Sequence, residues 1–322
     1  MRRKEVKVRV PVILRQVASS RLLLLIAHRS PRTSHLLTVT VPVVPTSWLA
    51  EHRFDPSLVV VDASWYLSAM NRNAREEYLA GHVPGAVFWD LDALSEQRTP
   101  LPHMLPDPAR FGCDVGALGI GNDHTIVVYD GSATNLSAPR VWWAFRVFGH
   151  DRVAVLDGGF GKWRAEGHPV ESGETRRPAA SFVARFRPEL VRSQDQVRSA
   201  LGEADTQLLD ARSTGRFLGR EPEPRVGIRS GHIPGAKNLP YTELVGPDGT
   251  LLSPSELRGK FAAAGIDLGR PVITSCGSGV SACALVLGLE LLGHRDYAVY
   301  DGSWTEWGGR EDLPIEVGPS RT

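Results

Sequence analysis

The residue of this chain best suited to chemistry is a cysteine that ends an apolar run. Residues 271–275 lead directly into Cys276, and a loop with two glycines within four residues precedes a helical pattern. Such glycines let the backbone curl so that successive N–H groups point inward and form a nest for an anion. A sulfur at the mouth of that nest, above a helix N-terminus, is favoured as the nucleophilic thiolate. The pattern predicts a nucleophilic Cys276, with a small apolar strand-end residue as the alternative. The nest amides would belong to Gly277, Ser278, Gly279, Val280 and Ser281.

The other two cysteines lack such a loop. Cys283 falls within an apolar helical pattern and Cys113 lies outside any glycine nest, so both are predicted to be structural. Three cysteines without a C-x-x-C pair fit neither a disulfide framework nor a zinc ribbon, and we expect no metal or organic cofactor. This cysteine usage is typical of a reducing compartment, and we predict a cytoplasmic protein.

The chain repeats itself at a domain-sized interval. The block Gly-His-Val-Pro-Gly-Ala at residues 81–86 recurs as Gly-His-Ile-Pro-Gly-Ala at 231–236, and Asp-Gly-Gly-Phe at 157–160 recurs as Asp-Gly-Ser-Trp at 301–304. An interval of about 150 residues indicates a duplicated domain and not a solenoid. We therefore predict a first domain over residues 41–170, a linker over 171–190 and a second domain over 191–318.

Each half alternates short apolar runs with longer helical patterns. Runs that short and continuous are typical of parallel strands buried on both faces, so the fold class is α/β, with helices on both faces of each sheet. The predicted strands cover residues 125–129, 152–156, 207–211, 271–275 and 297–300, and the predicted helices cover 138–148 and 281–292.

The near-neutral net charge of +1 conceals a basic leader. Residues 1–40 contain nine Lys/Arg and one acidic residue, Glu5, and the remainder is net negative. The acidic globular part argues against a nucleic-acid partner, and no apolar run reaches the length of a membrane span. The leader has the composition of an organelle transit peptide, and the alternative is an unstructured extension from an upstream start.

The repeated blocks and the Cys276 loop together resemble the rhodanese family, and within it the tandem-domain thiosulfate/3-mercaptopyruvate sulfurtransferases. The resemblance covers about residues 41–318 and implies two tandem rhodanese-like domains. It also implies a catalytic second domain and an inactive first one, because Asp130 aligns with Cys276. The implied reaction takes a sulfane sulfur from a small-molecule donor onto Cys276 and passes it to a thiol, a thioredoxin-like protein or cyanide.

The Cys276 loop and the arginine-rich segment at residues 215–225 indicate which sulfur donor is preferred. The resemblance implies a 3-mercaptopyruvate preference, because thiosulfate-preferring members carry basic residues where this chain has Gly277 and Ser278. Ser278 would then assist proton movement, or it would only close the loop through backbone hydrogen bonds. Arg216 and Arg225 match the substrate arginines of the family, which would bind a carboxylate and a ketone; the alternative is that they pair with nearby glutamates.

The resemblance implies a proton relay to Ser278, for which His82 of the first domain is the predicted histidine. The relay also implies an acid, but residues 71–73 hold no aspartate; Asn73 could orient the imidazole and could not stabilise its cation. His82 also has a duplicate in His232, which favours a structural role for both. A cysteine phosphatase is excluded, since Ala282 stands where the Cys-x5-Arg loop needs its arginine. Two other functions stay open: a thiosulfate-preferring enzyme, and a non-turnover sulfur carrier or protein-binding module.

Overall fold

The computed structural model describes residues 41–203 and 205–320. The basic leader predicted for residues 1–40 lies outside these ranges. Within them, no helix is long and apolar enough to cross a membrane.

Two five-stranded parallel sheets form the framework. Their strand orders are the same in sequence terms, β1-β5-β4-β2-β3 in the first half and β6-β10-β9-β7-β8 in the second. This duplicated topology confirms the predicted tandem α/β fold. The strands of the first sheet are β1 (Val43–Val44), β2 (Leu58–Asp62), β3 (Val87–Phe88), β4 (Thr125–Tyr129) and β5 (Val153–Leu156). Those of the second are β6 (Val191–Arg192), β7 (Gln207–Asp210), β8 (Lys237–Asn238), β9 (Val272–Ser275) and β10 (Tyr297–Tyr300).

The central strands are buried at every position because both of their faces are covered. In β2, Val59 and Val61 belong to one core cluster, whereas Leu58 and Val60 belong to the cluster on the opposite face. Successive side chains of a strand point to opposite faces, so a strand in a sheet covered on both faces buries its side chains on both sides.

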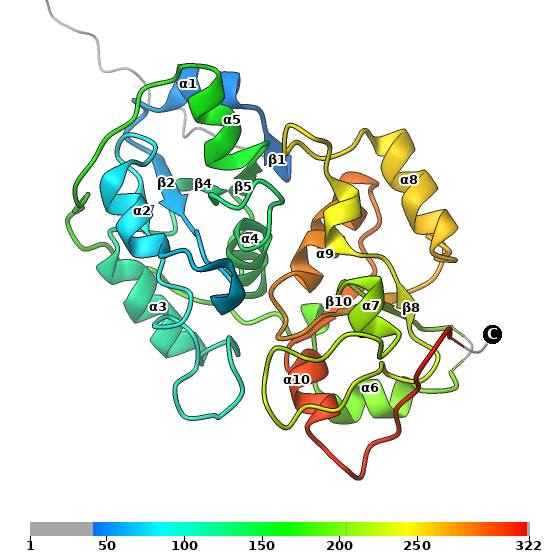
Figure 1. The fold of residues 1–322 in the computed structure, drawn as a ribbon. Coiled ribbons are helices and arrows are strands. Elements are labelled where there is room, and N and C mark those ends of the chain that lie inside the picture. The colour runs from blue at the N-terminus through cyan, green and yellow to red at the C-terminus, as the bar shows by residue number, and fades with distance from the viewer. Residues whose placement is uncertain (1–40, 204, 321–322) are drawn as a thin grey trace, which may run out of the picture. The chain divides into compact units, whose positions relative to one another are not determined.

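The helices lie around each sheet, as Figure 1 shows. Those of the first half are α1 (Thr46–His52), α2 (Ala74–Ala80), α3 (Pro108–Ala117), α4 (Ala138–Val147) and α5 (Gly159–Ala165). Those of the second are α6 (Gln194–Ala200), α7 (Thr214–Phe217), α8 (Pro254–Ala263), α9 (Ala282–Leu291) and α10 (Ser303–Gly308). Short 3-10 helices cover Ser68–Met70, Pro188–Leu190 and Tyr241–Leu244. α6 and α8 begin with complete capping boxes, at Ser193 and Ser253.

α4 and α9 join the two halves. Both helices are buried on nearly all sides and contribute to one continuous hydrophobic cluster. An ion pair between the partly buried Arg146 in α4 and the buried Glu290 in α9, with an N–O distance of 3.0 Å, crosses the same contact. Burial from both sides explains why the two helices lack a polar face in the sequence.

Between α5 and the 3-10 helix at Pro188–Leu190 the chain forms neither helix nor strand. It is nevertheless bonded to the first half, through Ala180 N to Gly116 O at 2.9 Å and Arg185 N to Phe148 O at 2.9 Å. The segment therefore packs along the first half before β6 begins.

Candidate active site

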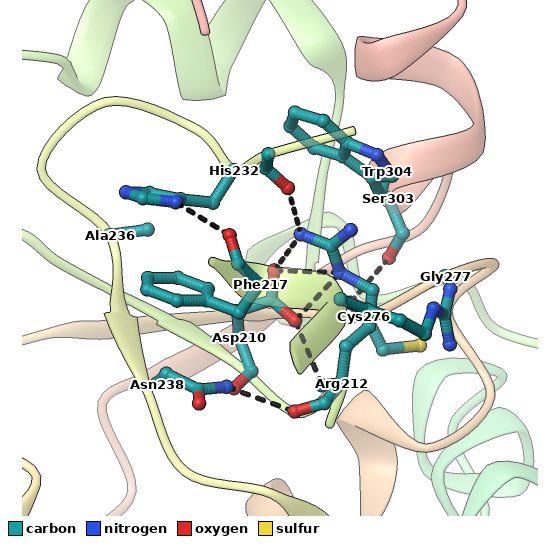
Figure 2. Close-up of polar contacts among 12 residues, drawn as sticks. Asp210, Arg212, Phe217, His232, Ala236, Asn238, Cys276, Gly277, Ser303 and Trp304 are labelled. Carbon is teal, nitrogen blue, oxygen red and sulfur yellow. Dashed lines mark hydrogen bonds and ion pairs between the residues drawn. The ribbon is translucent and has the colours of Figure 1, made fainter. Parts of the chain in front are cut away.

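Cys276 lies directly after β9, at the carboxyl end of the second sheet, and is 2% exposed. Its N–H donates to Ser303 Oγ at 3.1 Å, and its carbonyl accepts from Trp304 N at 2.9 Å. Figure 2 shows Cys276 and Gly277 beside Ser303. Gly277 O in turn accepts from Thr305 N at 2.8 Å. The start of α10 therefore fixes the backbone that carries the sulfur.

The loop after Cys276 curls as the two glycines predict. Gly279 has a φ of +76°, and a Cβ there would lie 2.6 Å from the Asp301 carbonyl, so only glycine fits without strain. Across residues 41–203 and 205–320, no hydrogen-bond acceptor is found for the amides of Ser278, Gly279, Val280 and Ser281. These donors are free to stabilise an anion.

The equivalent loop of the first half contains its own anion. Asp130 follows β4 as Cys276 follows β9, and its carboxylate accepts four hydrogen bonds. The donors are Ser132 N at 2.8 Å, Ser132 Oγ at 2.5 Å, Ser137 N at 2.9 Å and Ala138 N at 2.8 Å. A carboxylate has no sulfur to load, and here it occupies the nest itself. The loop geometry thus suits a negative charge in both halves.

A cavity of about 290 Å³ opens at Cys276. Three of its lining residues, Trp65, Leu67 and Leu136, come from the first half. The rest come from the second half: Arg212, Ser213, Arg216, Pro224, Arg225, Pro240, Tyr241, Thr242, Cys276, Gly277, Ser278, Val280 and Ser281. All the predicted loop and arginine residues are therefore brought together here except Gly279, which faces Asp301.

The two predicted substrate arginines differ in their partners. Arg216 Nη2 donates to Glu223 Oε2 at 2.5 Å, and the same nitrogen would lie 3.0 Å from a Cβ placed on Gly277. Burial lowers the pKa of Arg225, and the nearby Cys276 opposes that shift. Arg216 is therefore both ion-paired and next to the loop, whereas Arg225 presents a partly desolvated cation to the cavity.

Arg212 is a cavity residue that the sequence reasoning missed. Its guanidinium pairs with Asp210 at 2.7 Å and with Glu223 at 2.7 Å, and lies 4.5 Å from the Trp304 ring centroid. Figure 2 shows the Asp210–Arg212 pair beneath Trp304. Because Glu223 binds both Arg212 and Arg216, it fixes the position of the latter. The available signal was the location of Arg212 two residues after the end of β7.

Ser278 is hydrogen-bonded to a histidine of the first half. Its Oγ lies 2.9 Å from His103 Nδ1, and His103 Nε2 lies 3.0 Å from Asp92 Oδ1. Trp65 donates from Nε1 to the other oxygen of Asp92 at 3.1 Å. The hydrogen bond from His103 lowers the pKa of Asp92, although partial burial opposes the shift. This chain of hydroxyl, imidazole and carboxylate has the geometry of a proton relay.

The structure does not bring His82 to this cavity, which corrects the predicted relay. The buried His82 ring stacks on Tyr78, and its nitrogens bond to Tyr78 O at 2.8 Å and Thr175 Oγ1 at 3.2 Å. Asn73 caps α2 instead of orienting an imidazole. The histidine that contacts Ser278 is His103. His82 repeats as His232, whose ring likewise stacks on an aromatic side chain, Phe217, and bonds to the carbonyl of that residue at 2.8 Å.

Comparisons with known proteins agree with this architecture. Residues 46–166 and 193–310 match the model of the rhodanese-like domain. A thiosulfate/3-mercaptopyruvate sulfurtransferase named as mitochondrial, from Arabidopsis thaliana, is 45% identical over 302 residues, covering 87% of this chain and 79% of the relative. The 3-mercaptopyruvate sulfurtransferase of Rattus norvegicus is 44% identical, with 82% and 91% covered, and the thiosulfate sulfurtransferase of Bos taurus is 48% identical, with 82% and 91% covered.

A solved structure extends the likeness to three dimensions. The crystal structure of the 3-mercaptopyruvate sulfotransferase SseA from Escherichia coli superposes with a TM-score of 0.76 at 41% identity, covering 82% of this chain and 99% of the other. With two matched domains, relatives above 40% identity and a shared tertiary structure, this chain belongs to the rhodanese family in its tandem-domain form.

Proposed function

We propose that this protein is a sulfurtransferase that acts by double displacement through a persulfide on Cys276. The Cys276 thiolate attacks the transferable sulfur of the donor; a new S–S bond forms, and the bond from that sulfur to the rest of the donor breaks, which is the C–S bond of 3-mercaptopyruvate or the S–S bond of thiosulfate. An acceptor thiolate then attacks the outer sulfur and releases Cys276 as a thiolate. The observation that carries this proposal is the sulfur at the mouth of a loop of unpaired amides, which stabilise the anion in both half-reactions.

The donor that we propose is 3-mercaptopyruvate. Its thiol is protonated at neutral pH, and pyruvate leaves as an enolate that must take up a proton, so its sulfur transfer needs a proton relay. The Ser278–His103 contact at 2.9 Å supports that role. Arg216 and Arg225 line the same cavity and suit the carboxylate and ketone of the donor.

Thiosulfate is the alternative donor, because some relatives are named for it. It reacts as a dianion and leaves sulfite, so neither step requires a proton. A site built for it would place cations directly after the cysteine, where this chain has Gly277 and Ser278. The relay would then serve no purpose, which is why we favour 3-mercaptopyruvate.

Further parts of the proposal concern organisation and location. We divide the chain into a non-catalytic domain at 41–170, a linker at 171–190 and a catalytic domain at 191–318. The acceptor is a small thiol, a thioredoxin-like protein or cyanide. A cytoplasmic location stays a prediction from cysteine usage; the basic residues 1–40 and the relative named as mitochondrial support a targeting segment instead.

Steady-state turnover with each donor tests this function. We expect kcat/KM to be at least about 10-fold higher with 3-mercaptopyruvate than with thiosulfate, since a positioned proton-transfer group contributes roughly 10²–10⁴-fold. Ser278→Ala should lower the 3-mercaptopyruvate rate by at least about 10-fold and leave the thiosulfate rate within a few-fold. A preference for thiosulfate would contradict the proposed donor. A single loading without turnover, in the presence of excess thiol, would identify a carrier module.

A further inference from the structure

A buried guanidinium from the first half lies between the two parts of the proposed relay. Arg140, near the start of α4, is 2% exposed. Its Nη2 donates to the carbonyl of His103, and its Nη1 donates to the carbonyl of Gly279 at 3.3 Å. A single side chain therefore contacts the backbone on both sides of the Ser278–His103 hydrogen bond.

A carboxylate of the second half completes this arrangement. Asp301 Oδ1 lies 2.7 Å from Arg140 Nη1, and Asp301 Oδ2 accepts from Leu105 N, two residues beyond His103, at 2.9 Å. The Asp301 backbone also faces Gly279, where an added Cβ would lie 2.6 Å from its carbonyl oxygen. Each member of the pair thus contacts both the His103 segment and the Cys276 loop.

We propose that Arg140 and Asp301 form a clamp between the two halves that positions the His103 ring against the Ser278 hydroxyl. Arg140 is then a positioning residue for proton transfer and does not itself touch the donor. This inference rests on the proposed function. The hydrogen bond between Ser278 and His103 joins the two halves, so its length depends on how the backbones of both segments are held. A misplacement of about 1 Å between reacting groups costs roughly 100-fold in rate.

Loss of the clamp should slow the loading of Cys276 from 3-mercaptopyruvate and leave its loading from thiosulfate nearly unchanged. Sulfur transfer from 3-mercaptopyruvate moves a proton through Ser278 and His103, whereas thiosulfate loads Cys276 and releases sulfite without proton transfer. A residue that merely stabilises the fold would affect both donors equally. The ratio of the two loading rates therefore separates positioning from stability.

The test variant is Arg140→Lys, which keeps a positive charge but cannot reach three acceptors in a plane. Arg146→Lys is the matched control, because Arg146 lies in the same helix and pairs with the buried Glu290 across the same contact. Loading of Cys276 is followed by mass spectrometry in single-turnover reactions with each donor, alongside the thermal midpoint. We expect Arg140→Lys to slow loading from 3-mercaptopyruvate by about 10-fold or more and loading from thiosulfate by less than about 3-fold. Arg146→Lys should change neither rate by more than about 3-fold.

Equal slowing with both donors in Arg140→Lys, or no slowing with either, would overturn the clamp. If Arg140→Lys does not fold, Asp301→Asn replaces it, since an amide retains an acceptor for Arg140, and the same selective loss is expected. Wild-type protein that fails to load from 3-mercaptopyruvate overturns the proposed donor, and the clamp with it. If the wild-type protein loads from 3-mercaptopyruvate and neither Arg140→Lys nor Asp301→Asn changes that rate, the clamp is overturned and the proposed donor is not.

Discussion

At the scale of residues, hydrogen bonding determines which tautomer the neutral His103 ring adopts. The lowered pKa of Asp92 keeps its carboxylate charged, so it can only accept a hydrogen bond. His103 Nε2 must therefore donate to Asp92, and in the neutral ring Nδ1 accepts from the Ser278 hydroxyl. This orientation makes Nδ1 the base toward Ser278, as a relay from donor thiol to imidazole requires.

Asp92→Asn tests this orientation through the dependence of activity on pH. An asparagine can present an N–H to Nε2 and so favour the other tautomer, and we expect kcat with 3-mercaptopyruvate to fall by about 10- to 100-fold. This is less than the roughly 10⁴-fold loss for a buried triad aspartate, because the Asp92 side chain is 68% exposed.

The pH at which the loss appears follows from the direction of the pKa shift. A carboxylate with a lowered pKa contributes at all pH values above its ordinary pKa of about 4, and the contribution disappears as pH falls through the lowered value. The Asp92 carboxylate is therefore charged throughout the range from about pH 5 to 8, and the wild-type kcat should exceed that of the variant at every pH within it. A variant that reaches the wild-type kcat within this range would contradict the assignment. Asp90→Asn is the control, because the exposed Asp90 carboxylate accepts a hydrogen bond from Ala93 N, its own neighbour in the chain, at 3.0 Å.

At the scale of elements, the loops after β4 and β9 occupy equivalent positions in the two sheets, and both direct backbone N–H groups toward a site for a negative charge. The sequence predicts the curl of the second loop from its glycines, and Gly279 has the expected left-handed backbone. It does not predict that the Asp130 carboxylate satisfies the first loop, because four donors converge there only after folding. The comparison indicates that the backbone of both loops is arranged to hold a negative charge.

Gly279→Ala tests whether the Cys276 loop must pack closely against the backbone of Asp301. The new Cβ would meet the Asp301 carbonyl oxygen, a backbone atom that cannot move cheaply, so we expect destabilisation of about 1–3 kcal/mol and at least 10-fold slower loading of Cys276. Gly235→Ala is the matched control: its φ is +73°, but a Cβ there meets nothing within 4 Å. It should cost about 1–2 kcal/mol from backbone strain alone and leave loading unchanged. Equal loading rates in the two variants would contradict the account of the loop.

At the scale of the whole molecule, duplication determines what could be predicted. Repeated blocks and apolar runs are local signals, so the sequence identified the tandem α/β fold and the strands on either side of Cys276. Arg216 and Arg225 were found through a family resemblance, and both line the cavity. The relay escaped prediction because Ser278 and His103 are 175 residues apart and belong to different halves. His103 lies in a segment without periodicity, where sequence pattern carries no spatial information.

Of the three cysteines, only Cys276 lines the cavity, so we expect it to be the nucleophile. Burial raises the pKa of the Cys283 thiol well above its ordinary range, so it stays protonated, and Cys113 lies exposed on α3, away from the cavity. Asp130 occupies the nest of the first half. The molecule should therefore take up sulfur at a single position.

The most direct measurement is the mass of the protein after brief treatment with 3-mercaptopyruvate and removal of the excess donor. We predict a gain of one sulfur atom per chain, on the peptide that contains Cys276. The gain should disappear on adding a thiol acceptor, and in Cys276→Ser neither the gain nor turnover should remain. Sulfur bound at Cys113 or Cys283, or turnover that persists in Cys276→Ser, would contradict a mechanism through the Cys276 persulfide.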